Sequence, residues 1–162
     1  MSRRVRTAQH LMPRNTQVAA LPWRRGKAGL EILLVTTRTT KRWVIPKGWP
    51  MDGKADHEAA AQEAFEEGGV RGRVNPGPYG QYGYVKTSDK GFARAITVMV
   101  YALHVDEEFN DWPERAERER RWMTLAEAAE RVGEPELLLV LNKFTLEGPT
   151  RSLWQRIWDW LG

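Results

Sequence analysis

Runs of apolar and β-branched residues predict strands over much of the chain. "TQVAALPWR" (16–24) and "LEILLVTTR" (30–38) are two such runs, and "RRGKAG" between them is a plausible hairpin connection. Pro46 closes a shorter run, "RWVIP". Further strands are predicted in the ranges 42–46, 79–86, 92–105 and 119–123. We expect the strands 79–86 and 92–105 to pair with each other.

The segment 56–69 is predicted to form a helix, because its sequence contains a typical start and a typical end of a helix. Asp56 is a candidate N-cap for a helix over 57–67, and Glu58 lies in the first turn, where the helix dipole favours a carboxylate. The pair Gly68-Gly69 would end this helix in a left-handed conformation.

Three more helices are predicted in the C-terminal third of the chain. Thr124 and Glu127 have the spacing of a capping box at the start of the first one. The helices cover 125–132, 135–146 and 151–162. Strands interspersed with few helices indicate an α/β fold, a mixed β-sheet flanked by helices.

The last of these helices carries large apolar residues at helical spacing: Leu153, Trp154, Ile157, Trp158 and Leu161. We expect it to dock on the domain or on a second subunit, so a homodimer is one option. Binding to a membrane surface, assisted by a basic N-terminal tail, is the alternative.

The length of 162 residues fits one domain, and we expect a basic tail over 1–14 and a single domain over 15–162 that includes the helix 150–161. No apolar run is long enough to span a bilayer, and the N-terminus has no signal-peptide core. With no cysteine there are no disulfides and no thiolate metal sites. A cytoplasmic protein is the simplest interpretation.

The charge is unevenly distributed along the chain. The net charge is +4, which favours anionic partners such as phosphates or nucleic acid. The range 32–51 contains no acidic residue but four basic ones, whereas 52–67 contains six acidic residues and one lysine. A cationic segment that continues into an anionic one is what a site for a metal-bound polyphosphate requires.

Glu63, Glu66 and Glu67 lie at positions i, i+3 and i+4 and therefore share one face of the predicted helix. Carboxylate oxygens are the ligands that Mg²⁺ prefers, usually together with substrate phosphates. Taken alone, such a triplet is more often a solvated acidic face. The small residues Ala60 and Ala64 lie beside the glutamates and would let the helix pack closely on a sheet.

The range 48–70 resembles the Nudix box, G-x5-E-x7-R-E-U-x-E-E-x-G-U, in which U is aliphatic. Gly48 matches the first glycine, and the second half matches at Glu63, Glu66, Glu67, Gly69 and Val70. The chain thus resembles the Nudix hydrolases, and this resemblance implies a Nudix-type α/β/α sandwich with a mixed β-sheet and the loop-helix motif. Two positions depart from the box: Lys54 replaces the first glutamate, and Gln62 replaces the arginine that helps to orient the glutamates.

The flanking sequence narrows the resemblance to one branch of the family. "RWVIPKGWP" before the box and "FNDWPERAERERRWMTLAEAAERV" after it are similar to the diphosphoinositol-polyphosphate and diadenosine-polyphosphate hydrolases. The resemblance covers roughly the range 16–144. It implies a Mg²⁺-dependent pyrophosphohydrolase, with Mn²⁺ as the alternative ion, that acts on a small polyphosphorylated molecule.

The resemblance also implies roles for individual residues. Glu66 and Glu67 would bind the metal, Glu63 would bind it or orient the attacking water, and the carbonyl of Gly48 would be a backbone ligand. Which glutamate acts as the base stays open. Arg42 and Lys47, which adjoin the box, would hold substrate phosphates, with solvated surface cations as the alternative.

Further aromatic and charged residues near the box allow more than one interpretation. Trp49 could stack on a base or cover the turn, and Trp43 is expected in the core. The arginines of the range 114–121 alternate with glutamates, which predicts either a self-neutralising surface loop or a pocket for a highly anionic substrate, with Glu117 or Glu119 as a further carboxylate. The histidines lack metal-ligand spacing and are expected to be structural or exposed.

Two alternative functions remain beside the pyrophosphohydrolase. The basic charge would permit removal of pyrophosphate from the 5′ end of RNA. The replacements at Lys54 and Gln62 would suit a Nudix-fold binding module with weak or no catalysis, although all three glutamates of the second half of the box are retained.

Overall fold

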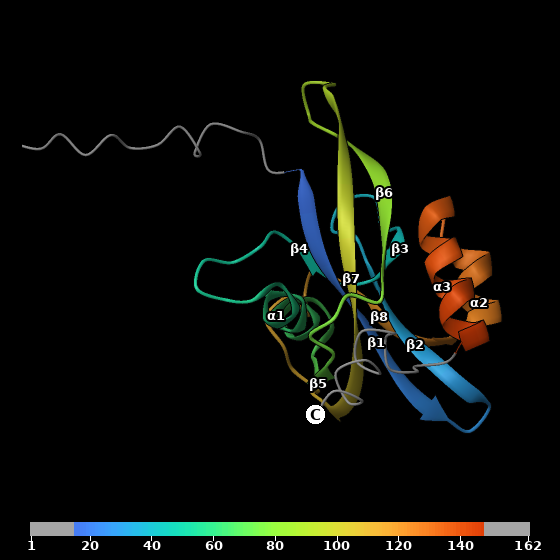
Figure 1. The fold of residues 1–162 in the computed structure, drawn as a ribbon. Helices are drawn as coiled ribbons and strands as arrows, with labels where there is room; N and C mark the ends of the chain where they lie inside the picture. Colours follow the sequence, from blue (N-terminus) through green and yellow to red (C-terminus); the bar gives the residue numbers. More distant parts are fainter. Residues whose placement is uncertain (1–14, 148–162) are drawn as a thin grey trace, which may run out of the picture.

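The first predicted strand is buried on both faces, which places it in the interior of a sheet. Val18 and Ala20 of β1 (Thr16–Gly26) pack in one hydrophobic cluster, and Ala19 and Leu21 pack in another; all four are fully buried. Successive side chains of a strand point to opposite faces, so each face of β1 must be covered by another layer. The computed structural model, which describes residues 15–147, shows these two layers of helices (Figure 1).

The sheet is mixed and is built around β1. Its main path runs β3–β2–β1–β7–β5, while β4 pairs with β1, β6 with β7 and β8 with β2. β1 and β7 are parallel, from Thr16↔Thr97 to Trp23↔His104, and the other pairs are antiparallel. The remaining strands are β2 (Gly29–Thr36), β3 (Trp43–Val44), β4 (Lys47–Gly48), β5 (Val70–Val74), β6 (Gly80–Thr87), β7 (Ala93–Glu108) and β8 (Arg120–Thr124).

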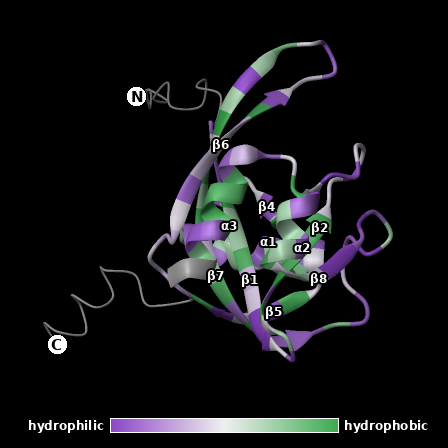
Figure 2. Cartoon of the chain, turned by 90° about the vertical axis from the view of Figure 1, so that its right-hand side faces the viewer, coloured by the Kyte–Doolittle hydropathy of each residue, from purple (hydrophilic) through white to green (hydrophobic). Residues whose placement is uncertain are grey.

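Helices cover both faces of this sheet. On one side lies α1 (Asp56–Gly68), whose alanines 59, 60 and 64 are fully buried against the sheet. On the other side lie α2 (Leu125–Arg131) and α3 (Pro135–Glu147), and Phe144 is their largest fully buried side chain (Figure 1). Colouring by hydropathy shows apolar residues along the central strands of the sheet (Figure 2). The predicted α/β sandwich with a mixed sheet is confirmed.

Most predicted elements are present, and several ends are confirmed. The hairpin between β1 and β2 closes at Gly26↔Gly29. Gly69 ends α1 with a φ of 65°, and the hydroxyl of Thr124 accepts a hydrogen bond from the Glu127 amide at the start of α2. The predicted helix 151–162 lies outside the described residues.

One expectation about the elements was wrong, and two strands were not predicted. Asp56 is not the N-cap: α1 begins at Asp56, and Ala55 precedes it without a side-chain cap. The short strand closed by Pro46 is present as β3, but a further short strand, β4, follows Pro46 and pairs with β1 instead of β2. β5 was not predicted, because its three central residues, "RGR", are exposed and carry no apolar pattern.

None of the helices within residues 15–147 is both long enough and apolar enough to cross a membrane.

Candidate active site

The three glutamates of α1 face one cavity. The sheet-facing alanines fix the rotation of α1, and this turns Glu63, Glu66 and Glu67 towards the strand that carries Lys47 and Gly48. The cavity has a volume of about 750 Å³, and residues of five other segments complete its wall: β1, the 37–42 loop, the stretch 44–49, β6 and the 109–119 loop. The residues that the sequence analysis placed in and beside the box all line this cavity: Arg42, Lys47, Gly48, Trp49, Glu63, Glu66 and Glu67.

Gly48 has no side chain, and the carboxylate of Glu63 occupies the space beside it. A Cβ atom at this position would force the end of the Glu63 side chain to move from its present place. Gly48 also pairs with Val18 of β1, which fixes the turn on the sheet. The first glycine of the motif and its first matching glutamate are therefore in direct packing contact.

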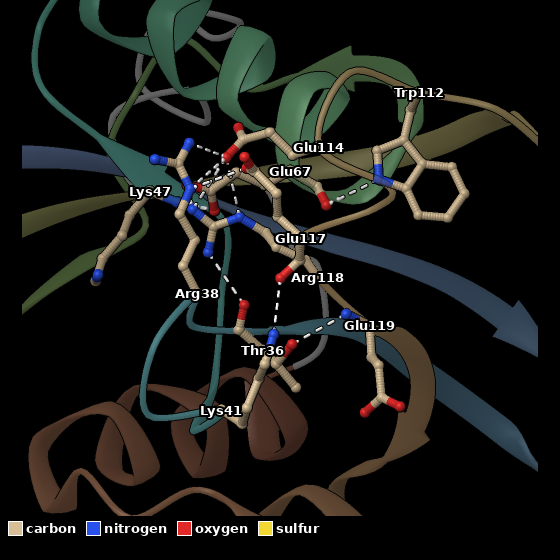
Figure 3. A network of polar contacts seen from close by, with 10 residues as sticks. All are labelled: Thr36, Arg38, Lys41, Lys47, Glu67, Trp112, Glu114, Glu117, Arg118 and Glu119. Carbon is tan, nitrogen blue, oxygen red and sulfur yellow. Dashed lines mark hydrogen bonds and ion pairs between the residues drawn. The ribbon is translucent and has the colours of Figure 1, made fainter.

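Glu67 is the most buried of the three glutamates and has the most partners. Its side chain is 7% exposed, its Oε2 accepts a hydrogen bond of 3.2 Å from the Lys47 amide, and its Oε1 lies 3.1 Å from Nη2 of Arg118. Arg118 is itself only 11% exposed and also donates to the carbonyl of Thr36, 3.0 Å away, and contacts Glu114 (Figure 3). Charged groups this buried are stable only when they are paired in this way.

Gln62, one of the two residues that depart from the Nudix box, orients Glu66. Nε2 of Gln62 donates a hydrogen bond of 3.0 Å to Oε1 of Glu66, one turn further along α1. An arginine at this position could make a charge-assisted bond, which is roughly twice as strong as a neutral one. Gln62 thus keeps the orienting contact in a weaker form.

The 109–119 loop closes the C-terminal end of α1. The last four carbonyls of a helix have no partner within the helix. Here four groups of the loop and of β8 donate to the carbonyls of residues 66–69: the Glu114 amide to Glu66 (3.0 Å), the Trp112 indole to Glu67 (3.1 Å), the Arg120 guanidinium to Gly68 (3.1 Å) and the Phe109 amide to Gly69 (2.8 Å). The guanidinium of Arg120 also lies over the Trp112 ring, 3.9 Å from its centroid.

This loop confirms in part that the alternating arginines line a pocket, because Arg118 lies in the wall of the cavity. It is not simply a solvated surface, because Arg118 and Arg120 are largely buried and bind α1. The further carboxylate of the cavity is Glu114 rather than Glu117 or Glu119. Glu117 pairs with Arg38 at 3.1 Å, and the carboxylate of Glu119 points away from Glu67 (Figure 3). Arg38 also forms an ion pair with Glu114.

The roles of Glu114, Arg118 and Trp112 could not be found from sequence spacing. They lie more than 40 residues from the box, in a stretch in which acids and bases simply alternate. Their loop lies beside α1 because β7 ends, and β8 begins, next to this helix. One signal was available, since the branch resemblance already covered "FNDWPERAERERRWM".

Two cations that line the cavity, Arg42 and Lys47, lie on the 37–42 loop and on β4. Hydrogen bonds within the 37–42 loop, from the Thr37 amide to the Arg42 carbonyl (2.8 Å) and from the Arg42 amide to the Thr37 hydroxyl (3.0 Å), fix the backbone of Arg42. The ammonium of Lys47 lies 4.9 Å from the centroid of the Tyr84 ring. Burial lowers the pKa of Lys47, while the nearby carboxylates of Glu67 and Glu134 oppose this change.

The two tryptophans near the box differ in position. Trp43 is partly buried and packs on the core, as expected, and it does not line the cavity. Trp49 lines the cavity, packs on the same core cluster, and has the cations of Lys86 and Arg94 within 5.5 Å of its ring. Its position supports the interpretation that it covers the turn.

The glutamates carry more negative charge than their surroundings compensate. Burial, together with Glu67 and Glu66, raises the pKa of Glu63 to about 7. Burial also raises the pKa of Glu67 to about 7, although Arg118 and the Lys47 amide act in the opposite direction.

The donor set fits a hard divalent cation. Three carboxylates on one helical face share the cavity with Glu114, and oxygen ligands of this kind suit Mg²⁺ and Mn²⁺. Within residues 15–147 no three acidic or histidine side chains converge as a ready-made ligand cluster. Glu67 is turned to Arg118 and Glu66 to Gln62, so binding a metal would require these two side chains to rotate.

The order of strands and helices defines an α/β domain of the Nudix type. A family model of the NUDIX domain matches residues 13–144, and the chain belongs to this family.

Two curated proteins are similar in sequence to 60–62% of this chain. Nudix hydrolase 12, mitochondrial, from Arabidopsis thaliana is 39% identical over 104 residues, which are 62% of this chain and 51% of the relative. Diphosphoinositol polyphosphate phosphohydrolase 3-beta from Bos taurus is 30% identical over 101 residues, 60% of this chain and 57% of the relative. The chain spans about half the length of the curated relatives it matches.

Among solved structures, a binary complex of Ap4A hydrolase from C. elegans has a similar fold. The TM-score is 0.62 and the sequence identity 18%, with 82% of this chain and 96% of that chain covered. At this identity the likeness concerns the fold alone.

Proposed function

We propose that the chain is a Mg²⁺-dependent pyrophosphohydrolase that cleaves a phosphoanhydride bond in a small polyphosphorylated molecule. The observation that carries the proposal is a single cavity that joins the carboxylates of the Nudix box to two cations, Arg42 and Lys47. The carboxylates suit metal ions and the two cations suit phosphates, and phosphoryl transfer requires both kinds of group close to the substrate.

The names of two relatives support a substrate class. Diphosphoinositol polyphosphates and the dinucleoside polyphosphate Ap4A appear in the names of proteins that resemble this chain in sequence or fold. We propose one of these two types as the substrate. The expected cytoplasmic location remains a prediction, and the Arabidopsis relative is named as mitochondrial. The homodimer remains a prediction too.

Each residue contributes a defined step to the hydrolysis. Glu66 and Glu67, with Glu63 and the Gly48 carbonyl, would hold Mg²⁺, which neutralises charge on the phosphate oxygens when it is bound. Arg42 and Lys47 would bind the phosphate oxygens of the substrate and fix its direction in the cavity. The water oxygen forms a bond to phosphorus, the bond to the bridging oxygen breaks, and a carboxylate of the cavity takes the proton of the water.

A binding module with weak or no catalysis is the second candidate. The observation that favours it is the pairing of Glu67 with Arg118, which occupies one of the carboxylates that a metal would need.

A magnesium titration separates the candidates. Phosphate release is measured from diadenosine polyphosphates, a diphosphoinositol polyphosphate and RNA with a 5′-triphosphate, for the unchanged protein and for Glu67→Gln. We expect Mg²⁺-dependent turnover of a small polyphosphate and a loss of about 10²-fold or more in Glu67→Gln. Turnover that needs no metal would refute the proposal. Tight binding without turnover would support the module, and a preference for the RNA would support the 5′-end reaction.

A further inference from the structure

The outer face of α3 lies on the surface of the domain. Phe144 on its inner face is fully buried, whereas the exposed fraction of Leu139 is 67%. Among residues 15–147, the other large apolar side chains that are exposed to this degree are Val85 and Phe92, and both belong to the β6–β7 hairpin. Figure 2 views α3 from outside, and none of the described helices and strands lies in front of it.

Leu139 borders a groove between α3 and the start of β6. The groove has a volume of about 380 Å³, and α3 lines it with residues 136, 139, 140 and 143, which have the spacing of one helical face. Residues 79–81 form its other side. The middle of the α3 side is apolar, with Leu139 and Val140, while Glu136 and Lys143 lie at its ends. A surface of this kind suits the apolar face of an amphipathic helix.

The sequence that follows α3 has the pattern of such a helix. α3 ends at Glu147, and Gly148 and Pro149 come next, which favours a turn because proline cannot continue a helix. The predicted helix 151–162 is sharply amphipathic. Its apolar face and its polar face consist of Leu153, Trp154, Ile157, Trp158 and Leu161 and of Ser152, Gln155, Arg156 and Asp159, respectively.

The lengths of the two helices also match. α3 has 13 residues and the range 151–162 has nearly the same number, so at about 1.5 Å per residue each helix is roughly 18–20 Å long. The connection 148–150 is short, as in the hairpins that join two antiparallel helices. A chain that folds back over this connection brings Trp158 level with Leu139 and Trp154 level with Lys143. An indole and an ammonium group attract each other when they meet in this way.

We infer that the segment 151–162 folds back on α3 of the same chain and covers this groove with its apolar face. The segment is attached directly to α3, so its effective concentration at the groove exceeds that of a second copy or of any other partner. Burial of the indoles and of Leu139 removes apolar surface from water and stabilises the contact. Glu136 at one end of the groove accepts a hydrogen bond of 2.9 Å from the Gly83 amide, so the covering helix also shields a contact that joins α3 to β6.

Disulfide trapping tests this placement, because the chain has no cysteine and only introduced thiols can react. The test pair is Leu139→Cys with Trp158→Cys, and the matched control is Leu139→Cys with Asp159→Cys. The two pairs differ by one position in the chain, but Asp159 lies on the polar face of the predicted helix. Both full-length variants are oxidised with copper phenanthroline, and non-reducing electrophoresis and mass spectrometry identify the bond that forms.

We expect the test pair to close within one chain at least about tenfold faster than the control pair. Equal rates would overturn the inference, because a segment that does not pack on α3 brings both positions to Leu139 equally often. A disulfide formed mainly between two chains would overturn it in favour of a second copy. Slow closure of the test pair, combined with flotation of the unchanged protein on anionic vesicles, would overturn it in favour of a membrane surface.

Thermal unfolding of variants without cysteine gives a second measurement. Leu139→Ser should lower the melting temperature by several degrees, whereas Phe92→Ser, at a residue that is exposed to a similar degree, should leave it unchanged. Trp158→Ser should lower it as well, and the double variant with Leu139→Ser should lose less than the sum, because both changes remove the same contact. Equal melting temperatures of Leu139→Ser and Phe92→Ser, or strictly additive losses, would contradict the placement.

Discussion

The guanidinium of Arg118 lies 3.1 Å from the carboxylate of Glu67, and both side chains are almost fully buried. Glu67 belongs to the Nudix box and Arg118 to the 109–119 loop. Arg118 therefore brings a positive charge from a distant part of the chain to a carboxylate of the box.

Removing this charge should destabilise the metal-free protein. Arg118→Met leaves Glu67 and Glu114 buried without a shared counter-charge, and breaking a buried pair costs about 3–5 kcal/mol. We expect urea unfolding in EDTA at pH 8 to show a loss of about 3 kcal/mol, and a smaller loss in saturating Mg²⁺. Arg115→Met is the control, because its pair with Asp111 is exposed and should contribute less than about 1 kcal/mol. A loss unchanged by Mg²⁺ would show that Arg118 acts through packing.

The indole of Trp112 should act on Glu67 through the backbone. Trp112→Phe keeps an aromatic ring beside Arg120 but leaves the Glu67 carbonyl without its donor, which should cost about 1 kcal/mol of unfolding free energy. We also expect a several-fold lower kcat with an unchanged KM, since substrate contacts remain. Trp122→Phe removes an indole bond to the exposed Glu108 and should change neither constant. A raised KM in Trp112→Phe would contradict a role in positioning.

The metal-free protein should lose stability as the pH rises. The pKa of Glu63 is raised from its usual 4.5 to about 7, so the folded state holds this proton more tightly than the unfolded state. Stability therefore falls between about pH 4.5 and pH 7 and shows no further change from this group above that range. In EDTA, Glu63→Gln should melt at a higher temperature than the unchanged protein at pH 8, and the difference should vanish near pH 4.5.

A control for this comparison is Glu130→Gln, because Glu130 is exposed on α2. Its melting temperature should follow that of the unchanged protein at every pH. If Glu63→Gln were less stable at pH 8, the repulsion among the glutamates would not be the dominant effect at this position.

The substitution Gln62→Arg should strengthen the orientation of Glu66. The amide of Gln62 already donates to Glu66 at 3.0 Å, and an arginine could replace it with a charge-assisted bond. We expect an equal or several-fold higher rate. Steady-state rates across a magnesium series would reveal competition with the metal as a higher magnesium requirement. Gln62→Leu, which removes the donor, should lower the rate. A collapse of the Gln62→Arg rate at saturating magnesium would show that the site is adapted to glutamine.

Local sequence patterns predicted the helices and strands whose formation depends on residues close to them in the chain. The helix that carries Glu63, Glu66 and Glu67 follows from its small buried residues and from Gly69, and the central strands follow from their apolar runs. The N-cap was predicted wrongly because an aspartate is favourable both at the N-cap and in the first turn of a helix, where the helix dipole stabilises its charge. β5 was missed because only its pairing with β7, across a bulge at Gly72, holds it in the sheet.

The other half of the site depends on long-range contacts, and sequence spacing does not encode these. Glu114, Arg118 and Trp112 reach the glutamates only because β7 and β8 end beside α1. In the sequence, their acids and bases alternate and neutralise one another, and this pattern does not show which of them contact α1. Likewise, Lys86 and Arg94 become neighbours only through the register of a hairpin.

The donors that close the end of α1 set an order of assembly for the molecule. The three glutamates lie in the first half of the chain, whereas all four donors to residues 66–69 lie in the range 109–120. During synthesis the three glutamates therefore leave the ribosome before the groups that bind the C-terminal end of α1. A folding intermediate without the segment 109–120 would leave the last carbonyls of α1 without these donors. A ligand that binds only the finished domain would shift the equilibrium towards complete folding.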